Sequence, residues 1–387
     1  MTVWIQNPFD NLPSEGYRKQ RYWMMCEAFV RAGHDVVFWT SSFSHAKKAF
    51  RRLDVQLFSR LEVRMIPTLP YPKNVCFKRI ESHRAYAHEW LRLALDNRTF
   101  EHSEHSNNPS LIITSTPTLS AAAVALDLGR KFGAKVVVDV MDAWPETFER
   151  LAPKGLRWLT KPFLLGMHRT ARRIYREADL VTGVCERYRE LTNRSDYYLA
   201  YHGIDLGLPS SVFCPRPHDT TQGIRLVYVG NLGKTYDLRT VVKAVEENED
   251  FELDVAGFGK FHSDCPRVRF RGLLSEPDLQ ALLQQSDIGI VPMRADSWVG
   301  VPYKFCDYSK AGLAIVSSLG GESSALLEKY GCGVTYRAGD PGSLAMAIRK
   351  AMTLERGASR TMCADEFDAT KIYDAYAARV LKLVQNS

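Results

Sequence analysis

A lysine and a carboxylate lie three positions apart near the start of one short predicted helix. Pro302 suits a first helical turn, the segment from Tyr303 can be helical, and Gly312 can end the helix. Lys304 then lies in the first turn and Asp307 one turn later. Amides and a cation at a helix start bind phosphate, and a carboxylate accepts hydrogen bonds from ribose hydroxyls. These residues therefore suit a sugar nucleotide.

A second candidate carboxylate follows an apolar run in the first half of the chain. Residues 136–140 predict a buried strand, and the carboxyl end of that strand delivers Asp142. Open α/β sheets bind ligands at this edge, although Asp142 can equally cap a helix that begins near Pro145. Gly16 follows the first predicted strand, where it allows a backbone to approach a ligand or simply forms a tight turn. Asp142 and Gly16 are thus candidates with a structural alternative each.

A basic, apolar-interleaved segment occupies residues 150–176. It carries eight Lys and Arg residues and no acidic residue. This pattern is typical of an interfacial helix on anionic lipid, and the alternative is a solvated helix whose apolar side packs on the sheet. Nucleic acid is not predicted as a partner, because no recognised nucleic-acid module surrounds the segment. The residues expected to face a membrane or an acceptor are Arg157, Trp158, Lys161, Arg169, Arg172 and Arg173.

Charge is distributed unevenly along the 387 residues. Residues 1–205 hold 30 Lys and Arg against 22 Asp and Glu, whereas the remainder holds 21 against 22. A basic half joined to a nearly neutral half predicts that one domain meets an anionic surface. No signal peptide or apolar run of about 18 residues is predicted, and the eight scattered cysteines are typical of reduced thiols. We expect a cytoplasmic protein, associated peripherally with the inner face of the cell membrane.

Strands and helices alternate along the chain, which predicts a doubly wound α/β fold. A proline-rich polar stretch after residue 205 predicts a domain boundary. We expect an N-terminal domain over residues 1–205, completed by about 366–387, and a C-terminal domain over 206–365. Helices are expected over residues 17–32, 76–97 and 150–176, and from 343 to the end, with residues 371–384 crossing back. Strands are expected over residues 2–6, 34–39, 61–66, 111–114, 136–140, 179–184, 224–229, 251–256, 288–292 and 313–316.

Short motifs in the second half resemble, in their order, the family 4 retaining glycosyltransferases. They are Gly230-Asn231-Leu232-Gly233-Lys234, Ala256-Gly257-Phe258-Gly259, Phe270-Arg271-Gly272, Ser286 to Pro292, Pro302 to Tyr308 and Ala311 to Val316. In the first half, His202-Gly203-Ile204-Asp205 and Arg31 to Val36 are similar to family segments. Asp139 to Pro145 most resembles bacterial surface-polysaccharide transferases of the N-acetylfucosamine-transferase kind. The resemblance implies the GT-B fold, in which two Rossmann-like domains face each other.

The resemblance also implies roles for individual residues. A nucleotide-diphospho-sugar, UDP-linked, would bind the second domain, and a saccharide or lipid-linked saccharide would bind mainly the first. Asp307 would grip the ribose, Lys234 would stabilise the leaving diphosphate, and Asp142 occupies the region of a family histidine. Gly16 would let its loop approach the diphosphate on closure. The donor-binding set is Gly16, Gly230, Asn231, Lys234, Gly257, Gly272, Tyr303, Lys304 and Asp307, and no metal or other cofactor is expected.

One departure from the family pattern affects the transferred sugar. Val299 stands where the family has the first Glu of its Glu-x7-Glu pair, and Asp296 is near enough in sequence to replace it. Two alternative functions follow. A nucleotide-sugar epimerase of the 2-epimerase type would need no acceptor surface, and a non-catalytic glycosyltransferase-like partner subunit would tolerate Val299. The expected function is transfer of a sugar with retention, in polysaccharide or glycolipid biosynthesis.

Overall fold

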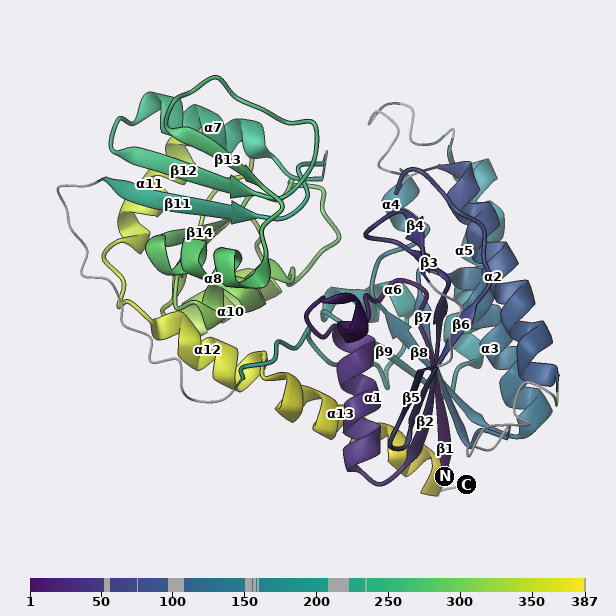
Figure 1. Ribbon diagram of the computed structural model, residues 1–387. Helices are drawn as coiled ribbons and strands as arrows, with labels where there is room; N and C mark the ends of the chain where they lie inside the picture. The colour runs from purple at the N-terminus through teal and green to yellow at the C-terminus, as the bar shows by residue number, and fades with distance from the viewer. Residues whose placement is uncertain are drawn as a thin grey trace. The chain divides into compact units, whose positions relative to one another are not determined.

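The chain folds into two compact α/β units, shown in the computed structural model in Figure 1. The structure describes residues 1–51, 56–74, 76–96, 108–149, 155, 158, 160–207, 223–233 and 235–385. Unit 1 is Met1–Tyr201 with Ala369–Ser387, and unit 2 is His202–Asp368. The division after residue 201 lies four positions before the boundary expected from the proline-rich stretch. The predicted α/β class, with two Rossmann-like domains and a C-terminal helix returning to the first, is confirmed.

Unit 1 is built on one large sheet in the order β10-β9-β8-β7-β1-β2-β6-β5. All neighbours are parallel except β5, which is antiparallel to β6. The chain runs outward from β1 through β2, then returns to β7 on the other side of β1, so the switch point lies between β1 and β7. The strands are β1 (Thr2–Gln6), β2 (Asp35–Ser41), β5 (Gln56–Phe58), β6 (Leu61–Ile66), β7 (Leu111–Thr116), β8 (Lys135–Val140), β9 (Leu180–Gly183) and β10 (Tyr198–Leu199).

Helices cover both faces of this sheet, which explains why its central strands read as continuous apolar runs. Helices α1 and α13 pack on one face, and α2, α3 and α5 lie over the other (Figure 1). A short hairpin, β3 (Phe43–Ser44) with β4 (Ala49–Phe50), follows β2. The helices are η1 (Pro13–Glu15), α1 (Arg21–Arg31), α2 (Phe77–Leu95), α3 (Leu119–Phe132), α4 (Glu146–Glu149), α5 (Lys161–Glu177), α6 (Arg187–Thr192) and α13 (Ala369–Gln385).

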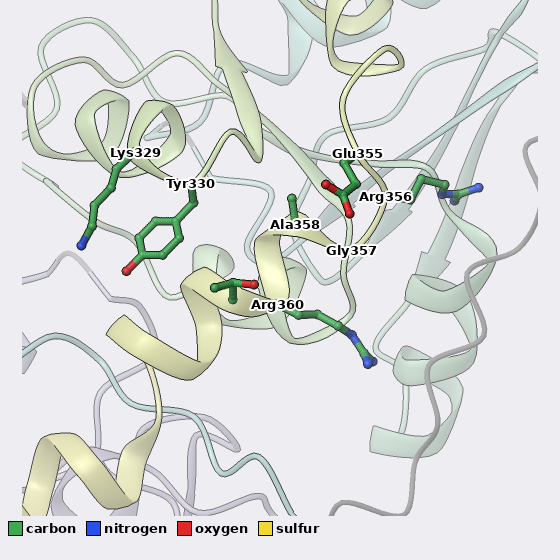
Figure 2. Close-up of a pocket in the computed structure, with 8 residues that line it drawn as sticks. Lys329, Tyr330, Glu355, Arg356, Gly357, Ala358 and Arg360 are labelled. Carbon is green, nitrogen blue, oxygen red and sulfur yellow. The ribbon is translucent and has the colours of Figure 1, made fainter.

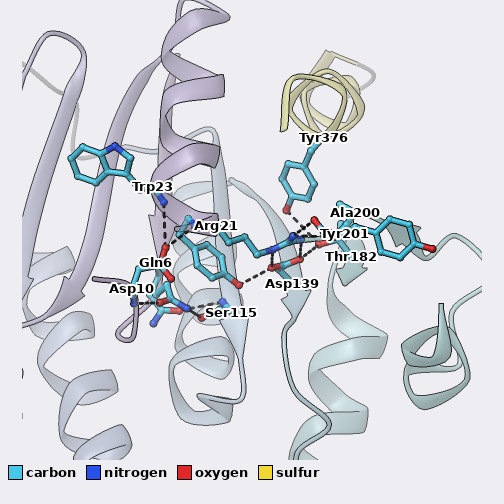
Figure 3. Close-up of polar contacts among 12 residues, drawn as sticks. Gln6, Asp10, Arg21, Trp23, Ser115, Asp139, Thr182, Ala200, Tyr201 and Tyr376 are labelled. Carbon is cyan, nitrogen blue, oxygen red and sulfur yellow. Dashed lines mark hydrogen bonds and ion pairs between the residues drawn. The ribbon is translucent and has the colours of Figure 1, made fainter. Parts of the chain in front are cut away.

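A buried ion pair ties the sheet of unit 1 to its first helix (Figure 3). The Arg21 guanidinium donates from Nε and Nη2 to the two carboxylate oxygens of Asp139, at 2.8 and 2.9 Å. The same arginine donates to the carbonyls of Ala200 and Tyr201, where the chain leaves the unit. Burial by itself would raise the pKa of Asp139, but Arg21 and the hydroxyl of Tyr22 hold that pKa below its usual range. The carboxylate therefore has a structural role.

Unit 2 has a smaller parallel sheet in the order β13-β12-β11-β14-β15-β16. Its switch point lies between β11 and β14, on either side of which the chain winds in opposite directions. The strands are β11 (Ile224–Val229), β12 (Phe251–Ala256), β13 (Val268–Gly272), β14 (Ile288–Val291), β15 (Ala314–Ser317) and β16 (Gly333–Thr335). The helices are α7 (Leu238–Glu247), α8 (Glu276–Gln285), α9 (Lys304–Lys310), α10 (Glu322–Lys329), α11 (Pro341–Ala351) and α12 (Ala358–Glu366).

A glycine in β14 lets helix α9 lie close to this sheet. Ile288 and Ile290 belong to the core under α7 and α11, so Gly289 between them faces the opposite side. A Cβ at Gly289 would collide with the ring of Tyr308 on α9. The Tyr308 hydroxyl accepts from the Val229 N–H and donates to the Ile290 carbonyl, joining α9 to β11 and β14. Helix α9 is thereby fixed against the strands that end at the switch point.

Three predicted helices differ from the observed ones. Helix α1 begins at Arg21 instead of residue 17, because the Asp10 carboxylate accepts from the Tyr22 and Trp23 N–H groups and defines the first turn. Helix α5 begins at Lys161, and residues 150–154 of the expected basic helix lie outside the described residues. The C-terminal region forms three helices instead of one run, with Gly357 in a left-handed conformation before α12. Among the described residues, no helix is long and apolar enough to cross a membrane.

Candidate functional site

Two glycine turns meet at the carboxyl ends of β11 and β12. Gly230 follows β11 with φ 138°, and Gly257 follows β12 with φ 145°. A Cβ on Gly257 would collide with the Gly230 carbonyl oxygen, so neither a larger residue nor an ordinary backbone angle fits. Gly257 donates to the carbonyl of Gly272 at 2.7 Å, which brings the third predicted glycine to the same edge. The predicted donor-binding glycines of unit 2 are therefore close neighbours.

Lys304 reaches this edge from the start of α9. Its side chain is only 8% exposed, and a Cβ on Gly230 would collide with its Nζ. The ammonium lies 4.8 Å from the ring centroid of Tyr228 and 4.3 Å from that of Tyr236, the geometry of cation–π contacts. In the part of the chain that the structure describes, Lys304 forms no ion pair. The glycine at 230 thus leaves space for a buried cation at the switch point.

Burial sets the electrostatics of this lysine. Desolvation lowers the pKa of Lys304 to about 8, while the nearby charge of Asp307 opposes the decrease. A buried ammonium is costly unless an anion approaches it, so an incoming phosphate would be stabilised here. The side chain of Asp307 is itself buried, one turn further along α9. Lys304 and Asp307 are thus held together as the sequence predicted.

Asn231 and Tyr303, two further predicted residues, lie in the turn after β11 and at the start of α9. The Asn231 carbonyl accepts from the Tyr228 hydroxyl at 2.6 Å, which fixes the turn after β11. Tyr303 is the N-cap of α9, and its ring packs edge-on against His202. Lys234 lies outside the described residues.

Val299 and Asp296 belong to the loop that precedes α9. The Val299 N–H donates to the Ser297 hydroxyl, so this position holds the loop through its backbone. The Asp296 carboxylate lies 3.7 Å from Arg294. Within the described residues, no group of three His, Cys, Asp or Glu side chains could hold a metal ion.

Asp142 of unit 1 follows β8 at the carboxyl edge of the large sheet. Its carboxylate accepts from the side-chain hydroxyl of Thr147 on α4 at 3.4 Å. Burial raises the pKa of Asp142, and the positive charge of Arg79 opposes that increase. The contact with Thr147 is compatible with a role in chemistry, because a raised pKa makes a carboxylate a stronger base.

Aromatic rings and cations from distant segments gather beside Asp142. The Arg79 guanidinium lies 4.8 Å from the Trp144 ring and 5.1 Å from that of Phe9. The Lys48 ammonium lies 4.5 Å from the Tyr71 ring. Sequence reasoning missed these residues, as it missed Tyr228 and Tyr236, because only the topology of the sheets brings them together. We call Lys48, Tyr71, Arg79 and Trp144 the cation–aromatic cluster.

A hollow of about 670 Å³ opens next to this cluster, between α2, α3 and α5. Trp144 and His83 line it, together with Phe77, which is 85% exposed, and Met167 of α5. Trp144, two residues after Asp142, thus belongs both to the wall of this hollow and to the cluster. Gly16 is the left-handed residue (φ 80°) that ends η1.

The outer face of α5 is basic. Lys161, Arg169, Arg172 and Arg173 are exposed, whereas Ala171, Ile174 and Tyr175 on the opposite side are buried. Arg173 pairs with Glu177. Trp158 is 65% exposed just before the helix, and Arg157 lies outside the described residues. The helix therefore packs its apolar side in the unit, as the structural alternative expected, and still presents a basic face.

A second hollow, of about 490 Å³, lies in unit 2 between the end of α10 and the start of α12 (Figure 2). Lys329, Tyr330, Arg356 and Arg360 are among its lining residues. Lys329 pairs with Glu366, and Arg356 with Asp287. Because Lys329 and Arg356 already have carboxylate partners, and none of the predicted donor-binding residues lines the hollow, it is not part of the candidate site.

Two family models match the chain. The model described as "Glycosyl transferase 4-like domain" matches residues 19–199, and the one described as "Glycosyl transferases group 1" matches residues 223–353. Together they cover most of both units. A search of the curated proteins gives no match.

Several solved structures share the fold. A sucrose-phosphate synthase from Thermosynechococcus elongatus is 14% identical over 100% of both chains, with a TM-score of 0.71. HepE of Anabaena, in complex with UDP-glucose, is 12% identical over 99% of both chains, with a TM-score of 0.63. A UDP-forming trehalose-phosphate synthase from Burkholderia xenovorans, in complex with glucose-6-phosphate, is 10% identical over 98% of this chain and 99% of that one, with a TM-score of 0.64.

Proposed function

Because the chain belongs to the GT-B glycosyltransferases, we propose that it transfers a sugar with retention from a UDP-linked donor to a saccharide or lipid-linked saccharide. The product would be a polysaccharide or glycolipid, and a transferase of the N-acetylfucosamine kind is the closest type that the motifs suggest. Unit 2 would bind the donor and unit 1 the acceptor. The solved HepE structure, which contains UDP-glucose, supports uracil as the donor base.

The observation that carries the proposal is the buried Lys304 ammonium against Gly230. Its contacts with Tyr228 and Tyr236 orient it without neutralising it. A diphosphate at the glycine turns would bring negative charge into contact with the ammonium, and Lys304 would stabilise the negative charge that develops on the leaving group. Asp307 would accept hydrogen bonds from the ribose. Lys234, which follows Gly233 in the sequence, would add a second cation.

Asp142 would act at the acceptor. Its ionised carboxylate would accept the proton of the attacking hydroxyl group, and because burial raises the pKa of Asp142, that carboxylate is a stronger base than an exposed one. No metal would be needed, because Lys304 and backbone amides at the glycine turns supply the positive charge. Retention would be seen as an unchanged anomeric configuration when the product is compared with the donor by NMR.

The basic face of α5 supports a lipid-linked acceptor at an anionic membrane surface. Exposed Lys161, Arg169 and Arg172 can attract lipid headgroups, and exposed Trp158 can enter the interfacial layer. The hollow lined by Phe77 and Met167 lies beside this helix and could hold an apolar chain. Peripheral association with the cytoplasmic membrane face would follow.

The test combines donor binding with turnover. Wild-type protein is titrated with UDP by calorimetry and then screened for UDP release from a panel of UDP-sugars, with and without acceptors and with EDTA. We expect UDP binding, EDTA-insensitive release, and a loss of at least about tenfold in UDP affinity for Lys304→Met. Lys350→Met, an exposed lysine of α11, is the matched control.

Each alternative function has its own signature in this experiment. An epimerase would convert a UDP-sugar to its epimer without any acceptor. A non-catalytic subunit would bind UDP normally but show no turnover that responds to Lys304, Lys234 or Asp142 variants. Failure of wild-type protein to bind any uridine nucleotide or UDP-sugar would contradict the proposal.

A further inference from the structure

The cation–aromatic cluster of unit 1 contains positive charge that the described chain does not neutralise. The Lys48 ammonium donates to the Asn74 side-chain oxygen at 2.8 Å and approaches His45 Nδ1 at 3.4 Å. Arg79 donates from Nη1 to the Asn74 carbonyl, and its Nε is buried without a hydrogen-bond partner. Within the described residues, neither cation forms an ion pair. Their partners are neutral oxygens, an imidazole and aromatic rings.

The charged groups that face this cluster leave it net positive. Lys48 and Arg79 repel each other, and the carboxylate that attracts Arg79 is Asp142. The nearby Arg51 is already paired with Glu15.

The two histidines near the cluster add no positive charge. Burial and repulsion from Lys48 and Arg79 lower the pKa of His45 to about 3, and burial and repulsion from Arg79 lower the pKa of His83 to about 3. Both imidazoles are therefore neutral near pH 7. The two positive charges of Lys48 and Arg79 face one negative charge, that of Asp142.

Holding these cations in place lowers the stability of the fold. Burial lowers the pKa of Lys48 to about 8, so its charge is desolvated more than that of a surface lysine. The backbone of Lys48 also has φ 54°, in the left-handed region that residues other than Gly, Asn and Asp rarely adopt. Such strain persists where the surrounding structure requires it, and it is concentrated at functional sites. Here it turns the tip of the β3–β4 hairpin so that Lys48 lies over Tyr71.

We propose that Lys48 and Arg79 bind a phosphate or diphosphate group carried by the acceptor. Two donors with unused hydrogen-bonding capacity match the several oxygens of a phosphate, and the Arg79 fork adds directional contacts. The position is consistent with this role, because Arg79 stacks on Trp144, which lies two residues after Asp142. The inference rests on the proposed glycosyltransferase function and narrows it: the acceptor carries an anionic phosphate near the attacking hydroxyl.

Binding of inorganic pyrophosphate tests the site directly. The full-length protein is first titrated with UDP, which establishes that unit 2 takes its donor, and pyrophosphate is then titrated in the presence of saturating UDP. We expect Lys48→Gln and Arg79→Gln to weaken pyrophosphate binding by about tenfold or more. Lys78→Gln removes the same charge from the exposed neighbour of Arg79 on α2 and should change the affinity by less than about twofold.

The two failures can be told apart. No UDP binding in the first titration would contradict the proposed function, whereas normal UDP binding with no pyrophosphate binding would contradict the phosphate site alone. Equal affinity for Lys48→Gln and wild type, or an equal loss for Lys78→Gln, would also overturn it. If Arg79→Gln fails to fold, Lys48→Gln decides, because Lys48 is only half-buried and glutamine retains a donor for Asn74.

Competition then identifies the source of the phosphate. Glucose 6-phosphate represents a soluble sugar phosphate, and geranyl diphosphate represents a lipid-linked diphosphate that stays dispersed in solution. The one that displaces pyrophosphate at lower concentration from wild type, and loses this advantage in Lys48→Gln, indicates the acceptor class. If neither competes, the proposal that the acceptor carries the phosphate is wrong.

Discussion

At the scale of single residues, the titration of Lys304 gives the most direct test of the donor site. Burial lowers its pKa to about 8, so in the free protein the ammonium is lost as pH rises through that value. If UDP binds the protonated form, its affinity should be constant below pH 8 and fall by up to about tenfold for each pH unit above it. Calorimetric titration with UDP between pH 7 and 9 measures this dependence.

The Lys304→Met variant serves as the control for that pH profile. Without the ammonium, UDP affinity should be weaker at pH 7 and should vary little between pH 7 and 9. A wild-type profile without the decrease above pH 8 would show that Lys304 does not contact the diphosphate. An unchanged decrease in the methionine variant would assign the titration to another group.

Gly230 should be as important for UDP affinity as Lys304, which packs against it. In Gly230→Ala, the added Cβ would collide with Lys304 Nζ, and φ 138° would be strained for alanine. We expect a loss of UDP affinity of about tenfold or more. Gly342→Ala, at the start of α11 with an ordinary contact at 3.5 Å, should bind UDP as wild type does. Equal binding by both variants would contradict the role given to Gly230.

At the scale of elements, the seating of α9 on β14 determines where Lys304 and Asp307 lie. Gly289→Ala would place a methyl group in the Tyr308 ring and should reduce the free energy of unfolding by about 1–3 kcal/mol, measured by urea denaturation. UDP affinity should fall as well, because α9 must shift. Gly320→Ala adds its methyl group to open space and should change neither quantity by much. A destabilised Gly289→Ala variant with normal UDP affinity would show that the packing of α9 on β14 does not determine UDP binding.

The elements differ in how well the sequence predicts them, for physical reasons. Strands β1 and β11 were predicted with their observed bounds, since each is a short apolar run ended by a polar or glycine turn. The placement of Lys304 and Asp307 within one turn of each other was predictable because both lie on one helix. Arg79 with Trp144, and Lys304 with Tyr228 and Tyr236, were not, because these contacts join segments far apart in the sequence. The start of α1 depends on the distant Asp10 carboxylate in the same way.

At the scale of the whole molecule, a substitution that destabilises one unit should leave the stability of the other unit unchanged. Asp139→Asn would leave the buried Arg21 guanidinium without its carboxylate and should reduce the stability of unit 1 by about 3–5 kcal/mol. Asp127→Asn, which disrupts an exposed pair with Arg130, should cost less than about 1 kcal/mol.

Tryptophan fluorescence during urea denaturation can distinguish the units. Of the seven tryptophans, only Trp298 belongs to unit 2. A Trp298→Phe background therefore makes the signal specific for unit 1. UDP binding, expected in unit 2, should survive at urea concentrations that unfold unit 1 of Asp139→Asn. Loss of both signals at one urea concentration would show that the units unfold together.

The split of unit 1 across the chain also has a consequence for its synthesis. Tyr373, Tyr376 and Val380 of α13 are fully buried in the core that α1 and β8 share. A ribosome delivers α13 only after all of residues 202–368, so unit 2 can fold while the first unit still exposes the apolar surface that α13 will cover. The earliest segment made is thus among the last to be completed. A nascent chain stalled before Ala369 should therefore hold a folded second unit and depend on chaperones for its first.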